Sequence, residues 1–233
     1  APSPPYFIDE SREDYFARTS FTQNQYFELK EFAQTNCNVD FLSSPFSVDA
    51  VQFLEDVSIS RYKIPSGEVT NLPLLEAVAS TNKPVILSSG MSPWDDINLA
   101  VSTLQENGVE DLSLLQCSSI YPCPPNDVGL NIMLEFNERY NLPVGYSDHT
   151  LGMAAPFAAA SLGAKIIEKH FTLSTLMYGS DAKHSMEPTE FKAMVDGLRE
   201  IELMLSNPVD KNQLAKDLEN MKLIFEKSLV VSK

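Results

Sequence analysis

Short apolar runs alternate with longer helical patterns along most of this 233-residue chain. Such alternation favours parallel βαβ units, and a repeat of roughly 20–30 residues fits a (β/α)₈ barrel better than an open doubly wound sheet. No GxGxxG motif supports a dinucleotide-binding fold. We expect strands at 39–43, 61–64, 85–88, 112–116, 144–147 and 165–168. We expect helices at 24–35, 48–57, 71–80, 93–107, 129–140, 151–162, 188–205 and 211–226.

A closed barrel of this class has eight strands, and the pattern supplies fewer. The sequence therefore predicts an α/β fold of the TIM-barrel type that lacks its first two βα units. Residues 1–228 would form this partial barrel domain, with a loop and a helix within 6–22. Residues 229–233 would begin a linker to a further domain.

Composition and charge narrow the classes of partner. The net charge of −15 argues against sequence-independent nucleic-acid binding and against binding to anionic membranes. No apolar run approaches the ~20 residues of a membrane span. Cys37, Cys117 and Cys123 lack disulfide or metal-ligand spacing, which predicts a reducing, cytoplasmic location, with Cys117 a buried small apolar residue.

Two of the three histidines each follow an apolar run at the end of a predicted strand. His149 and His170 are separated by an Ala-rich helical stretch that Gly163 ends. If the two strands are neighbours in a parallel sheet, the imidazoles could share one divalent metal. The alternative is two unrelated histidines, one capping a helix and the other packed in a core.

Small hydroxyl groups and a lysine also follow the predicted strands. Serines beside backbone amides, together with a lysine, make a plausible phosphate site. A single serine there could instead cap the next helix, and a single lysine could be an edge residue. The polar strand ends include Ser44, Lys63, Ser66, Ser88, Ser119, Tyr121 and Ser147.

Five ordered motifs between about residues 26 and 206 resemble the sialic acid synthase family. Members are (β/α)₈ enzymes that condense phosphoenolpyruvate with an N-acylated mannosamine-type sugar to give a nonulosonic acid and phosphate. The resemblance also implies a homodimer for the full-length protein. The motifs are Lys63-Ile-Pro-Ser-Gly-Glu68, Leu87-Ser-Ser-Gly-Met91, Gln116-Cys-Ser-Ser-Ile-Tyr-Pro122, Gly145-Tyr-Ser-Asp-His-Thr-Leu-Gly152 and Glu168-Lys-His-Phe-Thr172.

The resemblance implies roles for these residues. His149 and His170 match divalent-metal ligands, usually for Mn²⁺, with Mg²⁺ or Co²⁺ as alternatives. Lys63, Glu68 and Asp181 match catalytic positions, Lys63 on the phosphate side and the two carboxylates near the sugar. His184 either lines the sugar pocket or lies exposed in a loop. Substrate-binding positions match Ser44, Ser66, Ser88, Ser119, Tyr121 and Ser147.

Two family features have no match in the sequence. Full-length members begin with a strand that carries a proposed acid/base glutamate, and they end with a small antifreeze-like domain expected here from Leu229. We therefore expect weak or no turnover from these 233 residues alone, since a general acid/base contributes ~10²–10⁴-fold.

Several functions remain open from the sequence. The acceptor could be N-acetylmannosamine, its 6-phosphate or a diacetamido sugar of the legionaminic or pseudaminic type. The sequence Ser66-Gly67-Glu68 favours the sialic or legionaminic branch. A non-catalytic remnant that binds metal or sugar phosphate is a second class. A metal-dependent hydrolase is a third, although such sites usually have further carboxylate or histidine ligands.

Overall fold

A computed structural model describes residues 10–213 and 216–227, and its centre is a parallel sheet. The strands lie side by side in chain order, and every neighbouring pair is parallel. The predicted α/β class with parallel βαβ units is confirmed. The strands are β1 (Tyr62–Ile64), β2 (Val85–Ser88), β3 (Leu112–Cys117), β4 (Val144–Asp148) and β5 (Ile166–Lys169).

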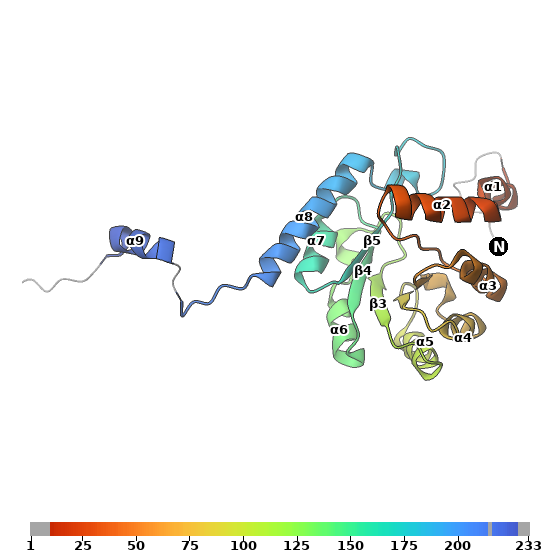
Figure 1. Cartoon of the computed structure of the whole chain (residues 1–233), viewed down its shortest axis with the longest axis horizontal. Helices are drawn as coiled ribbons and strands as arrows, with labels where there is room; N and C mark the ends of the chain where they lie inside the picture. Colours follow the sequence, from red (N-terminus) through yellow and green to blue (C-terminus); the bar gives the residue numbers. More distant parts are fainter. Residues whose placement is uncertain (1–9, 214–215, 228–233) are drawn as a thin grey trace, which may run out of the picture.

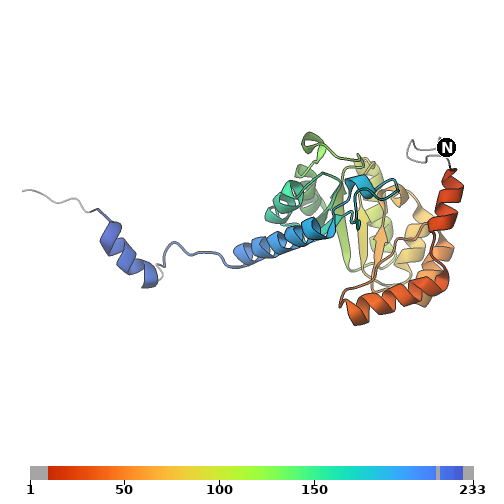
Figure 2. The ribbon, with the colours of Figure 1, turned by 90° about the horizontal axis from the view of Figure 1, so that it is seen from above.

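The helices from Val48–Val57 (α3) to Pro188–Ser206 (α8) cover the outer face of this sheet in chain order (Figure 1). Figure 2 shows the same arrangement from above, and in both views α9 lies apart from the sheet and its helices. The helices are α1 (Arg12–Thr19), α2 (Gln23–Asn36), α3 (Val48–Val57), α4 (Leu72–Ala79), α5 (Trp94–Glu106), α6 (Asn131–Tyr140), α7 (Ala154–Ser161), α8 (Pro188–Ser206) and α9 (Lys216–Phe225). Short 3₁₀ turns lie at Ser66–Glu68, Pro125–Asp127 and Ala182–His184.

The helix starts follow from local hydrogen bonding. Thr22 caps α2 in a reciprocal capping box with Gln25, and the Ser47 hydroxyl accepts from an amide in the first turn of α3. The prediction for 151–162 was wrong at its start, because Gly152 has φ +84° and α7 begins only at Ala154. At the other end, α9 begins at Lys216 rather than 211. None of the helices within the described ranges is long and apolar enough to cross a bilayer.

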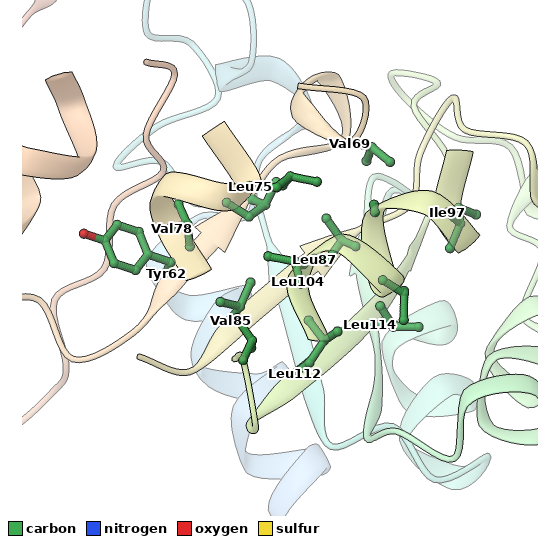
Figure 3. Packing of buried hydrophobic residues seen from close by; sticks show 14 of the residues in the cluster. Tyr62, Val69, Leu75, Val78, Val85, Leu87, Ile97, Leu104, Leu112 and Leu114 are labelled. Atoms are coloured by element: carbon green, nitrogen blue, oxygen red, sulfur yellow. The ribbon is translucent and has the colours of Figure 1, made fainter. Parts of the chain in front are cut away.

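The hydrophobic core lies between the sheet and its helices (Figure 3). Alternate strand residues such as Tyr62, Leu87 and Leu114 point into this layer and are at most 1% exposed. Tyr62 also donates from its hydroxyl to Glu55 at 2.8 Å, which satisfies the buried oxygen. Because side chains alternate along a strand, the same pattern leaves the polar residue Lys63 on the inner face.

One predicted strand is absent. Residues 39–43 form no regular secondary structure, so the prediction of a strand there was wrong. Asn38 takes a left-handed conformation with φ +52°, and the Val39 amide donates back to Ala33 in α2. These two features hold the start of the segment against the end of α2, and Val39 is 56% exposed rather than packed in the core. The predicted linker at 229–233 lies outside the described residues.

Candidate active site

A cavity of about 360 Å³ opens at the carboxyl ends of the strands. This is the end where parallel α/β folds collect their functional side chains. Most of the residues that the sequence predicted for a site line this one cavity. They are Lys63, Ser66, Ser88, Ser119, Tyr121, Ser147, His149 and His170, joined by Pro65, Gly67, Met91, Cys117 and Glu168.

Lys63 and Glu168 form an ion pair inside the cavity. The Lys63 Nζ lies 2.9 Å from Glu168 Oε2, and the Ser147 hydroxyl donates to Oε1 of the same carboxylate at 2.7 Å. The Lys63 side chain is 13% exposed and that of Glu168 is 41% exposed. The cavity therefore holds a lysine whose charge is balanced by a carboxylate that solvent reaches.

Ser88 contributes a buried hydroxyl without a partner. Its residue is 1% exposed, and its Oγ makes no hydrogen bond to any described group. Buried hydroxyls nearly always have a partner, so an orphaned one at a cavity wall is explained by a water, an ion or a ligand that supplies it. Ser88 ends β2 and faces the same cavity as Lys63.

Gly90 lets three side chains crowd together beside Ser88. A Cβ added at Gly90 would lie 2.4 Å from Ser119 Oγ, 2.7 Å from Ser66 Oγ and 3.1 Å from Cys117 Sγ. The Gly90 amide also donates to Ser66 Oγ at 3.0 Å. Only glycine leaves room for these two hydroxyls and the thiol, because any Cβ at position 90 would collide with them.

The imidazoles of His149 and His170 are neighbours, with ring centroids 5.2 Å apart. His149 Nδ1 lies 2.8 Å from the Ser118 carbonyl oxygen. Since a carbonyl only accepts, this nitrogen carries the proton and Nε2 of the neutral ring keeps its lone pair.

Burial lowers the pKa of His170. Burial also lowers that of His149, but contacts with Cys117 and the Ser118 carbonyl outweigh it, so the His149 pKa is raised.

These two rings have the donor type and proximity that a shared divalent cation requires. In the part of the chain that the structure describes, however, no group of three or more His, Cys, Asp or Glu side chains is arranged to hold a metal ion. The residues present therefore fit a two-histidine half-site, whose further ligands would be water or substrate oxygens. The Tyr121 ring lies against His149, with ring centroids 4.1 Å apart and ring planes tilted by 39°. Burial foremost raises the pKa of Tyr121 to about 12, so its hydroxyl stays protonated.

Some predicted residues lie outside the main cavity. Ser44 lines an adjoining cavity together with Lys63 and Glu168, on the inner side of the sheet. Asp181 lines a cavity on the other side of His170, and its carboxylate lies 3.9 Å from His170 Nδ1. The Glu68 carboxylate accepts from Asn71 at 2.7 Å and does not line the cavity. His184 lines neither neighbouring cavity.

Sequence reasoning missed the place of Glu168 in the binding cavity and took Cys117 only for a buried apolar residue. The signal for Glu168 was available, because residues 168 and 170 lie on the same face of a strand and His170 was already assigned to the site. Cys117 ends β3 and lies 3.9 Å from His149 Nδ1, so its thiol forms part of the cavity wall.

Several known proteins have sequences or structures similar to this chain. An uncharacterised protein of Methanocaldococcus jannaschii is 45% identical over 86% of this chain and 60% of its own length. The N,N'-diacetyllegionaminic acid synthase of Campylobacter jejuni is 41% identical over 84% of this chain and 59% of its own length. A solved N-acetylneuraminic acid synthetase of Leptospira borgpetersenii, in complex with citrate, superimposes with a TM-score of 0.82 at 31% identity, covering 94% of this chain and 76% of that one.

Other relatives at 36% and 35% identity are named N-acetylneuraminate-9-phosphate synthase, from Drosophila melanogaster, and pseudaminic acid synthase, from Helicobacter pylori. The chain spans about 60% of the length of the first two curated relatives. The model of the NeuB family matches residues 6–210. The resemblance found in the sequence motifs is thus confirmed, and the chain belongs to the NeuB family.

Proposed function

We propose that this chain carries the phosphoenolpyruvate half of a synthase that makes a nonulosonic acid. The observation that supports this most directly is the buried Ser88 hydroxyl, which lacks a partner and faces the same cavity as Lys63. A phosphate group offers acceptor oxygens to such a hydroxyl and negative charge to the lysine. In a chain with net charge −15, a local cation is needed to hold an anion of this kind.

Phosphate binding would rearrange the ion pair. Lys63 would turn from Glu168 towards the phosphate oxygens, while Ser66 and Ser88 orient the group. Ser147 and Tyr121 line the same cavity, and the protonated Tyr121 hydroxyl can donate to a carboxylate or phosphate oxygen. The enol carbon of phosphoenolpyruvate would then attack the aldehyde of the sugar, water would add at C2, and phosphate would leave by C–O cleavage.

His149 and His170 would hold a divalent cation, with Mn²⁺ the first choice and Mg²⁺ or Co²⁺ the alternatives. Such an ion supplies Lewis-acid polarisation of the sugar carbonyl when bound. The chain's own contribution is the Ser118 carbonyl, which fixes the His149 tautomer so that Nε2 is available. Asp181, whose carboxylate lies 3.9 Å from His170 Nδ1 in the neighbouring cavity, would contact the sugar.

For the acceptor we propose an N-acylated amino sugar of the sialic or legionaminic branch. The 41% identity to a legionaminic acid synthase and the sequence Ser66-Gly67-Glu68 support this choice. A homodimer, a cytoplasmic location and an eight-stranded barrel in the full-length protein are part of the same proposal. The competing proposal is a non-catalytic remnant that binds a metal or a sugar phosphate.

Calorimetry of phosphoenolpyruvate binding to wild type, Lys63→Met and Lys83→Met tests the phosphate site. Lys83 is the matched control, because it also pairs with a carboxylate, Glu55 at 2.6 Å, but lines no part of the cavity. We expect Lys63→Met to weaken binding at least tenfold and Lys83→Met to leave it unchanged. Equal affinity of all three proteins would refute the assignment of Lys63.

Turnover is a separate measurement. Phosphate release from phosphoenolpyruvate, with N-acetylmannosamine or a diacetamido sugar present, should be weak or absent with this chain alone. Robust release would refute that expectation and exclude the non-catalytic remnant. Phosphoenolpyruvate binding without turnover is the outcome that our account predicts.

A further inference from the structure

A buried ion pair lies on the opposite face of the sheet from the cavity. Asp148 of β4 and Lys169 of β5 are direct cross-strand partners. Their side chains are 0% and 1% exposed, and Lys169 Nζ lies 2.5 Å from Asp148 Oδ2. A buried ion pair is weak evidence for a stabilising role, because desolvation of two charges offsets much of their attraction. The pair is therefore better explained by the groups that it holds in place.

The Asp148 carboxylate is fully engaged. Besides Lys169, it accepts from the Tyr146 hydroxyl at 3.0 Å, from the Thr150 amide at 2.9 Å and from the Thr150 hydroxyl at 3.2 Å. Lys169 Nζ also donates to the Thr150 carbonyl oxygen. These contacts hold the chain at Asp148 and at Thr150, the two residues on either side of His149.

Each member of the pair is the chain neighbour of a cavity histidine. Asp148 precedes His149 and Lys169 precedes His170, and strand alternation directs the charged pair to the helix side while the imidazoles face the cavity. The ion pair thus joins the two strand ends that carry the histidines. A change in the length of either charged side chain would therefore move the two imidazole rings relative to one another.

We propose that Asp148 and Lys169 are a positioning pair, which sets the separation of His149 and His170 for two-point binding of one divalent cation. The inference rests on the proposed metal half-site and adds what determines its geometry. Neither residue touches the cation in this account. Their effect reaches it through the backbone at positions 148–150 and 169–170.

Mn²⁺ affinity of wild type, Lys169→Met, Lys169→Arg and Asp148→Glu tests the pair, with Lys83→Met as the control for loss of an ion pair remote from the cavity. Removal of supporting groups behind metal ligands typically weakens metal binding about 10–100-fold. We expect a loss of this size in Lys169→Met, a smaller loss in the two charge-conserving variants, and no change in Lys83→Met. The visible spectrum of bound Co²⁺ should shift in the same variants, because it reports ligand geometry.

If Lys169→Met does not fold, Lys169→Arg and Asp148→Glu still test the inference, because both keep the charges of the pair. Circular dichroism and thermal unfolding monitor the fold in each case. Folded variants with wild-type Mn²⁺ affinity and a wild-type Co²⁺ spectrum would overturn the inference, even if their melting temperatures fall, since the pair would then be merely structural. If wild type itself binds no Mn²⁺, the proposed half-site fails first, and the inference fails with it.

Discussion

Lys63 of β1 and Glu168 of β5 meet at 2.9 Å between Nζ and Oε2, although their strands form the two edges of the described sheet. In a flat sheet, four strand-to-strand steps would separate them by roughly 19 Å. That is well beyond the combined reach of the two side chains, so the sheet curls and its inner face closes around the cavity. The contact thus shows that the sheet curves in a barrel-like manner and that Lys63 is paired with a carboxylate.

Glu168→Gln should strengthen anion binding. In the proposed site, Glu168 competes with an incoming phosphate for Lys63. A partly exposed ion pair contributes about 1 kcal/mol or less to stability. We therefore expect the affinity for inorganic phosphate to rise roughly two- to fivefold in Glu168→Gln. Calorimetry at low salt measures it. Glu55→Gln, which frees Lys83 outside the cavity, is the matched control. A tenfold loss of phosphate affinity in Glu168→Gln would contradict this account.

Ser88→Ala separates ligand binding from stability. The buried hydroxyl has no partner among the described groups, so its removal should leave the free energy of unfolding unchanged or raise it by up to about 1 kcal/mol. Phosphoenolpyruvate affinity should fall about tenfold, because a hydrogen bond to a charged group is lost. Chemical denaturation and calorimetry give the two values.

Ser89→Ala is the contrast for that variant. Ser89 is also buried, but its hydroxyl donates to the Leu115 carbonyl at 3.0 Å and lies outside the main cavity. We expect a loss of about 1 kcal/mol in stability and no change in ligand affinity. The same result for both serines would show that Ser88 is an ordinary structural residue.

Gly90→Ala should damage the cavity more than the fold. The new methyl group would displace the Ser66 and Ser119 hydroxyls, which can rotate away at small cost but then no longer face a ligand. Gly197→Ala is the reverse case, since its methyl group would lie 2.6 Å from the Phe157 ring where α7 packs against α8. We expect Gly90→Ala to lose phosphoenolpyruvate binding and Gly197→Ala to lose stability; a swap of these effects would be contrary to the structure.

The segment before α8 should loosen in acid. The Thr175 amide and hydroxyl donate to Glu187 and lower its pKa below the ordinary value of 4.5. A depressed carboxyl pKa contributes stability above the ordinary value, and that contribution is lost as pH falls through the folded one. The melting temperature of wild type should therefore exceed that of Glu187→Gln at pH 7, and the difference should shrink as pH falls below 4.5 and through the lower pKa of the folded state. A difference independent of pH would disprove the linkage.

Much of the fold was predictable because it rests on local signals. The apolar runs predict β1 to β5 within a residue or two, and the strand-end rule predicts that Lys63, Ser88 and His149 lie at one edge of the sheet. The prediction of a strand at 39–43 failed because the apolar residues there resemble those of a strand. Whether such a segment joins a sheet depends on hydrogen bonding to a neighbouring strand, which the sequence pattern does not specify. Curvature is also a property of the whole sheet, which is why the approach of Glu168 to Lys63 was not foreseen.

The Asp148–Lys169 pair was hidden for a related reason. In the sequence, Asp148 and Lys169 are ordinary polar residues at the ends of two predicted strands. Only the register between β4 and β5 makes them partners. The cavities beside Ser44 and Asp181 likewise depend on which segments fold next to the strand ends.

The most direct test of the account is calorimetry of phosphoenolpyruvate with and without Mn²⁺, on wild type, on the His149→Ala/His170→Ala double variant, and on His184→Ala as the control outside the cavity. We predict that Mn²⁺ binds wild type and His184→Ala and strengthens phosphoenolpyruvate binding to both, and that the double variant loses the metal and this effect. Binding of Mn²⁺ to the double variant with wild-type affinity, or no binding of either ligand to wild type, would contradict the proposal.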